Sequence, residues 1–335
     1  MGLDDLTMTD QPEPAPLTPP ALLTPEDHER LHLPPEPGDH LPHLRSAWRR
    51  MVQGPVALVG PSPARHARVG ALERQSRRAS AATRILSSRN WSGATITPHG
   101  GQQFVLAFGA WTVPTPKLPP NPDQQGPGDY ACSAWIGSDG ARRYLDASLP
   151  QIGTEQRLRP DTPNPVCNAF FQWWSPHETH PKDHYHPIPG LLIEPGSQVM
   201  AMLWAIDPTH VVAALRTFGP HPQLAAQLWQ APLLTLDNGI QTRPVIAGAT
   251  AEWIVERPRN ISLQRFPDYG QVDFTHCIAA TAPTPGPPTR EQILAAPKLL
   301  RMFEVPPNTP SRTRMISHAR RTADTDCQVT YGSLP

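Results

Sequence analysis

The sequence predicts an all-β protein, built as an antiparallel sandwich or barrel. Three observations support this fold class. Proline accounts for 45 of the 335 residues, and interior prolines break helices but suit turns and edge strands. Short apolar runs alternate with polar residues at the period of a strand. Turn sequences (HGG, SDG, PGS, DNG and DYG) recur at short intervals, as in hairpin-rich proteins rather than in βαβ units.

Individual strands can be placed from about Leu86 onward. Residues 102–114 alternate, so that Phe104, Leu106, Phe108 and Ala110 share a face. The other predicted strands cover 249–256, 269–280 and 324–331, and 191–206 is expected to form two strands broken at Pro195 and Gly196. Within 269–280, Val272, Phe274 and His276 should share a face. The exception is 289–300, which we expect to form a short helix interrupted by Pro297.

Residues 1–85 differ from the predicted β domain at 86–334. They are rich in proline, acidic up to Asp39 and arginine-rich after it, which predicts a largely disordered extension or a pro-segment. Leu41, Leu44, Trp48 and Met51 have helical spacing, so one amphipathic helix is expected there. A solvated extension is one interpretation. The other is a basic segment that shields an acidic cleft in a pH-sensitive way.

Composition narrows the classes of partner. Charged residues make up 17% of the chain and the formal net charge is zero, so we expect neither nucleic acid nor membrane as a partner. The four cysteines contain no CxxC pair, which argues against a zinc ribbon, while one or two disulfides stay open. The first residues have neither a basic start nor an apolar core, so no signal peptide is expected.

Several sequence blocks of the β region, taken in order, resemble the glutamic peptidase (eqolisin) family. These blocks are NWSGA (90–94), WTVP (111–114), YACSAWIGSDG (130–140), LPQIG (149–153), AFFQWWSP (169–176), IEPGSQV (193–199) and AEWIVERP (251–258). The resemblance implies a sandwich of two curved antiparallel sheets, of concanavalin-like or jelly-roll type, with a cleft on a concave face. It also implies an acid-acting endopeptidase with Gln151 and Glu256 as the catalytic pair.

The chemistry of the two side chains agrees with this expectation. Hydrolysis of a peptide by water needs a base for the proton of the water and a donor for the oxyanion. Glu256 would be the general base and then the acid, and the amide of Gln151 would hold the water and stabilise the oxyanion. Glu252 lies on the same strand face as Glu256, and a second carboxylate there would raise one pKa. Both glutamates could instead be ordinary edge charges, so Glu252 is a candidate substrate-binding residue whose role stays open.

Four further residues are candidates for substrate binding. Trp135 and Asp139 should line the cleft near Gln151, although Asp-Gly is also a common turn. Phe171 and Trp173 are candidate walls of the cleft, or else core residues. Gln172 departs from the glutamate that well-known fungal members carry, which puts the pH optimum in question.

No metal or organic cofactor is expected. His177, His180, His184 and His186 cluster in one stretch, but Pro181 replaces the second histidine of an HExxH motif, so an inserted polar loop is favoured. The expected partner is a polypeptide substrate, acted on by a monomer. The resemblance implies secretion, which the missing signal peptide does not support. The alternative function is a non-catalytic β-sandwich module that binds carbohydrate or peptide, because sandwiches serve both roles.

Overall fold

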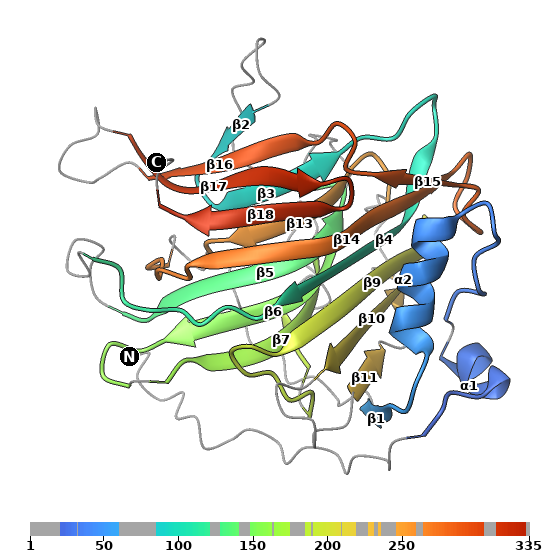
Figure 1. The fold of residues 1–335 in the computed structure, drawn as a ribbon, viewed down its shortest axis with the longest axis horizontal. Coiled ribbons are helices and arrows are strands. Elements are labelled where there is room, and N and C mark those ends of the chain that lie inside the picture. Colours follow the sequence, from blue (N-terminus) through green and yellow to red (C-terminus); the bar gives the residue numbers. More distant parts are fainter. Residues whose placement is uncertain are drawn as a thin grey trace.

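A computed structural model describes residues 21–31, 33–59, 85–120, 128–140, 148–162, 164–174, 185–188, 190–208, 210–218, 227–230, 234–235, 246–258, 264–304 and 313–332. In this part of the chain two antiparallel sheets pack face to face, and the two helices, which come first in the sequence, lie at the right-hand edge of Figure 1. The predicted all-β sandwich is confirmed.

Sheet I carries the site described below. Its strands follow the order β8-β7-β6-β5-β13-β3-β16-β17-β18-β14, with β2 parallel to β16. The bounds are β2 (Ile85–Ser88), β3 (Trp91–Ile96), β5 (Tyr130–Ser138), β6 (Leu149–Leu158), β7 (Val166–Trp174), β8 (His186–Pro187), β13 (Ala251–Glu256), β14 (Gln271–Ala282), β16 (Lys298–Glu304), β17 (Arg314–Ala323) and β18 (Asp326–Tyr331).

Sheet II packs against sheet I through the main core. Its order is β14-β4-β9-β10-β11-β1, with β15 on the free side of β14 and β12 on β10. The bounds are β1 (Ala57–Val59), β4 (Gln103–Thr112), β9 (Gln198–Asp207), β10 (His210–Phe218), β11 (Gln227–Gln230), β12 (Leu234–Thr235) and β15 (Arg290–Ile293).

Strand β14 belongs to both sheets. Residues 271–274 pair with β18 in sheet I, and the segment from Thr275 pairs with β4 in sheet II. The register shifts between Thr275 and Ile278, where His276 has a φ of 52°. Such a bulge bends and twists a strand, which lets β14 change sheets. His276 therefore does not continue the alternation of Val272 and Phe274, contrary to the sequence prediction.

Each sheet buries one face against the other. The main apolar core combines residues such as Trp253, Ile136 and Phe171 from sheet I with Leu203 and Val211 from sheet II. Successive residues of a strand point to opposite faces, so the chain neighbours of these sheet I residues point away from sheet II. That outward face of sheet I carries a second, smaller apolar cluster and the candidate site.

The predicted amphipathic helix is confirmed as α2 (Pro42–Val52), in which Leu44, Trp48 and Met51 are buried. It packs on the outer face of sheet II, against a cluster that includes Met202 and Ile278 (Figure 1). The described part of the N-terminal arm, residues 21–31 and 33–59, is built into the fold, because sheet II offers an apolar face that it covers. These residues lie on the side of the sandwich opposite the outward face of sheet I. The interpretation of residues 1–85 as an extension or pro-segment stays a prediction.

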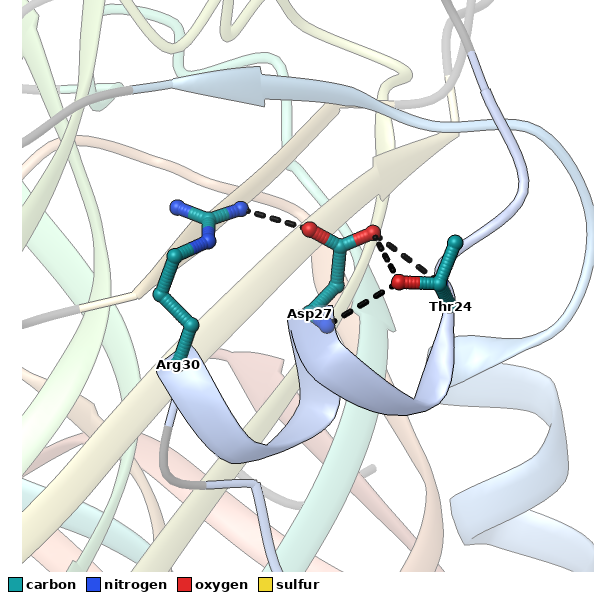
Figure 2. A network of polar contacts seen from close by, with 3 residues as sticks. All are labelled: Thr24, Asp27 and Arg30. Carbon is teal, nitrogen blue, oxygen red and sulfur yellow. Dashed lines mark hydrogen bonds and ion pairs between the residues drawn. The ribbon is translucent and has the colours of Figure 1, made fainter.

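Helix α1 (Pro25–Arg30) begins with a capping box, shown in Figure 2. The hydroxyl of Thr24 accepts a hydrogen bond from the amide of Asp27 at 3.1 Å, and the Asp27 carboxylate accepts one from the amide of Thr24 at 3.0 Å. Arg30 donates to the other oxygen of Asp27 at 2.7 Å. These contacts satisfy amides that a helix start leaves without intrahelical partners.

Two further local predictions were wrong. The segment expected to be a helix at 289–300 forms β15 and the start of β16. Pairing with β14 and β3 outweighs its helical propensity, which is a weak determinant of structure. Residues 191–194 form no strand in the structure, so only the second half of 191–206 behaves as predicted, as β9.

Candidate active site

Gln151 and the two glutamates of β13 point to the same face of sheet I. Gln151 on β6 lies opposite Gly137 on β5, and Gly137 lies opposite Glu252 on β13. On its other side Gln151 lies opposite Gln172 of β7. Directly opposed residues project to one side of a sheet, so Gln172, Gln151 and Glu252 share the outward face. Glu256 follows Glu252 by an even number of residues and joins them there.

Glu256 is a buried carboxyl group held by side-chain donors. It is 3% exposed. Its Oε1 accepts a hydrogen bond from Nδ2 of Asn90 at 3.1 Å, and its Oε2 accepts one from Nε1 of Trp135 at 2.8 Å. Burial raises the pKa of Glu256 to about 7, and the hydrogen bonds from Trp91, Trp135 and Asn90 oppose that rise. Such a group can exchange a proton near neutral pH.

Gln151 is held by a second amide. It is 1% exposed, and its Nε2 donates a hydrogen bond to Oε1 of Gln172 at 2.8 Å. The buried Oε1 of Gln151 has no hydrogen-bond partner among the described residues. Because nearly all buried polar atoms in native proteins are hydrogen-bonded, this oxygen marks a place where a water or substrate group can bind. The second hydrogen on Nε2 is likewise available to a substrate oxygen.

The indole of Trp135 lies between Gln151 and Glu256 on the outward face. Gln151 faces Gly137 and Glu256 faces Ser133, which are four residues apart on β5. A Cβ on Gly137 would lie only 2.8 Å from the indole ring of Trp135, so the ring covers Gly137, while its Nε1 reaches Glu256. A side chain at position 137 would displace this ring. Glycine at 137 therefore allows the indole to lie beside Gln151 while its Nε1 donates to Glu256. The structure gives no direct hydrogen bond between Gln151 and Glu256 in the described residues.

Asp139 lies in the turn that follows β5, with a φ of 72°, which is the alternative that its Asp-Gly sequence left open. It is 1% exposed, and its carboxylate accepts hydrogen bonds from the amides of Ala247, Gly248 and Ala249 at 2.6, 3.2 and 2.6 Å. Burial raises its pKa to about 6 against these bonds. Asp139 therefore anchors the segment that leads into β13, the strand that carries Glu252 and Glu256.

Phe171 and Trp173 also lie away from the site. They belong to the core between the sheets. Their neighbours Phe170 and Trp174 lie on the outward face instead, in a cluster with Trp91, Trp135 and Leu149. The face that each residue of β7 occupies follows from the pairing of Gln172 with Gln151, because residues two positions from Gln172 share its face.

Sequence reasoning also missed Glu155. It lies four positions after Gln151 on β6 and so shares its face, and it is 4% exposed. Arg157 donates to its carboxylate at 3.0 Å. Tyr185, whose ring stacks on Phe170 with centroids 5.0 Å apart, lies near the same carboxylate, which contributes to raising the pKa of its hydroxyl.

No cluster of three or more potential metal ligands occurs in the part of the chain that the structure describes. The predicted histidine-rich loop lies outside the described residues except for His186. Among the described helices, neither has the length and apolarity needed to cross a membrane.

Comparisons with known proteins agree with this architecture. The profile of the Peptidase A4 family matches residues 89–298. A solved structure of scytalido-glutamic peptidase with a peptide-based transition state analog has a TM-score of 0.51 and 16% identity, and the match covers 73% of this chain and 98% of that one. SCP-B, an eqolisin solved with the tripeptide Ala-Ile-His, has a TM-score of 0.50, 16% identity and the same coverage. No curated protein sequence matches this chain.

Proposed function

This chain belongs to the peptidase A4 family and is a glutamic-type peptidase, and from that premise we propose that it cleaves peptide bonds within polypeptides by means of Glu256 and Gln151. The observation that supports the pair most directly is their shared setting. Each is almost completely buried on the outward face of sheet I, one as a carboxyl group with a raised pKa and the other as an amide whose oxygen has no hydrogen-bond partner among the described residues. Perturbed pKa values and unsatisfied polar groups of this kind concentrate at functional sites.

In the proposed reaction Glu256, in its ionised form, takes a proton from a water molecule that attacks the carbonyl carbon of the substrate. Gln151 Oε1 accepts a hydrogen bond from that water, and Nε2 donates its second hydrogen to the oxyanion that develops. Glu256 then returns the proton to the leaving nitrogen, which restores the starting state. Asn90 and Trp135 hold the carboxylate, and Gln172 holds the amide.

Substrate is expected to contact the apolar cluster beside this pair. The cluster on the outward face combines Trp91, Leu149, Phe170 and Trp174 with Ile254 and Leu300. Aromatic side chains offer large apolar contact area to a peptide. We therefore expect extended polypeptides with bulky apolar residues near the scissile bond to be the better substrates. As a separate proposal, the chain acts as a monomer.

The pKa of Glu256 bears on the working pH. A general base must be ionised, and a pKa of about 7 leaves only a small fraction ionised in acid. Under this mechanism kcat/KM should rise with pH up to about 7, rather than peak in the acidic range that the family resemblance implies.

The test is hydrolysis of denatured protein across a pH series by the wild type, Gln151→Ala and Glu256→Gln. Loss of the oxyanion donor should reduce turnover by roughly 10² to 10³. Loss of the base should reduce it at least as much. Gln198→Ala and Glu194→Gln change the same residue types at exposed positions outside the site and should leave activity unchanged. Wild-type activity in both site variants would exclude the proposed pair, and an inactive wild type would favour a non-catalytic binding module.

A further inference from the structure

Besides Glu256 and Glu252, a buried carboxyl group faces the site from β6. Glu256 lies directly opposite Ser133, and Ser133 lies directly opposite Glu155. The three residues form one cross-strand row on the outward face, with Glu155 two strands away from Glu256, about 10 Å between backbones. Ser133, the residue between them, is small and itself 5% exposed.

Glu155 is fixed in place by its own partners. Arg157, on the same face two positions along β6, donates to its Oε1 at 3.0 Å. The carboxylate is the main cause of a raised pKa of Arg157. On the other side lies Tyr185, which is held by stacking on Phe170. The negative charge of Glu155 is thus held within the cluster of side chains that surrounds the site.

We propose that Glu155 is a positioning residue of the site, a fixed buried carboxylate that acts across Ser133 on the proton of Glu256. The inference rests on the function proposed above for Glu256. Two carboxyl groups in one buried site are favoured to carry unequal charge, with one ionised while the other holds a proton. Arg157 pairs with Glu155 and not with Glu256, so the proton is assigned to Glu256.

The other charged groups around Glu256 do not replace this role. On its own strand the outward face carries Glu252, which is fully buried. From β3 the facing residues are Trp91, Gly93 and Thr95, and from β5 they are Ser133 and Trp135, none of which is charged. On the β6 side, the described ionisable residues are Glu155 and its neighbours Arg157 and Tyr185. Glu155 contributes to the raised pKa of Glu256.

The experiment measures the titration of Glu256 independently of catalysis. The full chain is labelled with ¹³C at glutamate carboxyl carbons, and the signal of Glu256 is identified by its absence in Glu256→Gln. Titration midpoints are compared among the wild type, Glu155→Gln and Glu194→Gln. The midpoint in Glu155→Gln should fall by about half to one pH unit, as expected for a charge at that distance in a partly screened interior. The ascending limb of the kcat/KM profile should move by the same amount.

The exposed control Glu194→Gln should move neither measurement. The double variant Glu155→Gln/Arg157→Gln leaves no unpaired guanidinium and serves if Glu155→Gln fails to fold; its midpoint should also fall. An unchanged midpoint in a folded Glu155 variant would overturn the inference. If Glu256→Gln kept full activity while the midpoint of Glu256 still moved in Glu155→Gln, the catalytic assignment would fail and the electrostatic link would stand.

Discussion

Nε2 of Gln151 donates to Oε1 of Gln172 across 2.8 Å, so a neighbouring amide sets the orientation of the proposed oxyanion donor. An accepting oxygen at position 172 forces Gln151 to present its own free Oε1 and its second hydrogen to the site. The glutamine at 172, which stands where well-known fungal members carry a glutamate, thus retains an acceptor for Gln151.

Replacing Gln172 should test this orientation. Gln172→Leu removes the acceptor and leaves Nε2 of Gln151 free to turn, and misplaced catalytic groups lose activity steeply. We expect kcat to fall by roughly 10- to 100-fold with little change in KM. Gln172→Glu keeps an acceptor and should retain most activity at neutral pH. Equal activity in Gln172→Leu and the wild type would contradict the role of this contact.

The hydrogen bond from Trp135 to Glu256 should be visible in the pH profile. Trp135→Phe removes a donor to the ionised carboxylate, and losing such a donor favours the protonated form. The pKa of Glu256 should rise above about 7, and the ascending limb of kcat/KM should move up by about one pH unit. Trp204 lies on sheet II, and its indole donates a hydrogen bond to the carbonyl of Gly286. The control Trp204→Phe removes that bond and should leave the ascending limb of kcat/KM unchanged. A downward movement in Trp135→Phe would be inconsistent with the structure.

Buried carboxyl groups should make the protein less stable as pH rises. Burial raises the pKa of Glu256 from 4.5 to about 7 and that of Asp139 from 3.8 to about 6. A raised folded-state pKa means that the folded state binds protons more tightly than the unfolded state, so this stability is full below about pH 4 and is lost as pH rises to about 7. For Glu256 alone the loss is roughly 3 kcal/mol.

Urea unfolding at pH 5 and pH 8 would measure this dependence. The wild type should have the lower free energy of unfolding at pH 8. In Glu256→Gln the difference between the two pH values should shrink by roughly 3 kcal/mol. An identical pH dependence in that variant would show that Glu256 titrates normally in the folded protein.

Arg216 is expected to hold the N-terminal arm against the outer face of sheet II. It is 3% exposed, and its guanidinium donates to the carbonyls of Met51 at 2.9 Å and Gln53 at 2.6 Å, at the end of α2. The last carbonyls of a helix have no amide donors within the helix, and a cation at this end supplies hydrogen bonds to them. Arg216→Met should lower the free energy of unfolding by roughly 2 to 4 kcal/mol and expose α2 to protease, because it leaves buried carbonyls unpaired.

Activity of the Arg216→Met protein, measured well below its Tm, should match the wild type because α2 lies on the far side of the sandwich. Arg320→Met, an exposed arginine of β17, provides the control and should change stability little. Loss of activity in folded Arg216→Met would mean that the arm contributes to the site.

The sequence predicted those parts of the fold that local pattern determines. Alternation in AEWIVE correctly places Glu252 and Glu256 on one face, and the spacing of Leu44, Trp48 and Met51 correctly gives a helix. Neither pattern says what the element packs against. The docking of α2 depends on an apolar face of sheet II that is assembled from strands distant in sequence.

Tertiary context explains the remaining differences. Phe171 and Trp173 have the right residue type for a cleft wall, but which face they occupy depends on the register of β7 with β6, which only the pairing of Gln172 with Gln151 reveals. Asp139 has the sequence of an ordinary turn, and its role as an anchor depends on three amides that lie more than a hundred residues away.

Because β14 is shared between the sheets, the two layers cannot slide past each other without bending one continuous backbone at His276. Mechanical strain applied to the face that carries α2 is therefore transmitted through a single strand into the sheet that carries Glu256. The bend at residues 275–277 therefore bears on the shape of the sheet that carries Glu256, although these residues lie in a different strand.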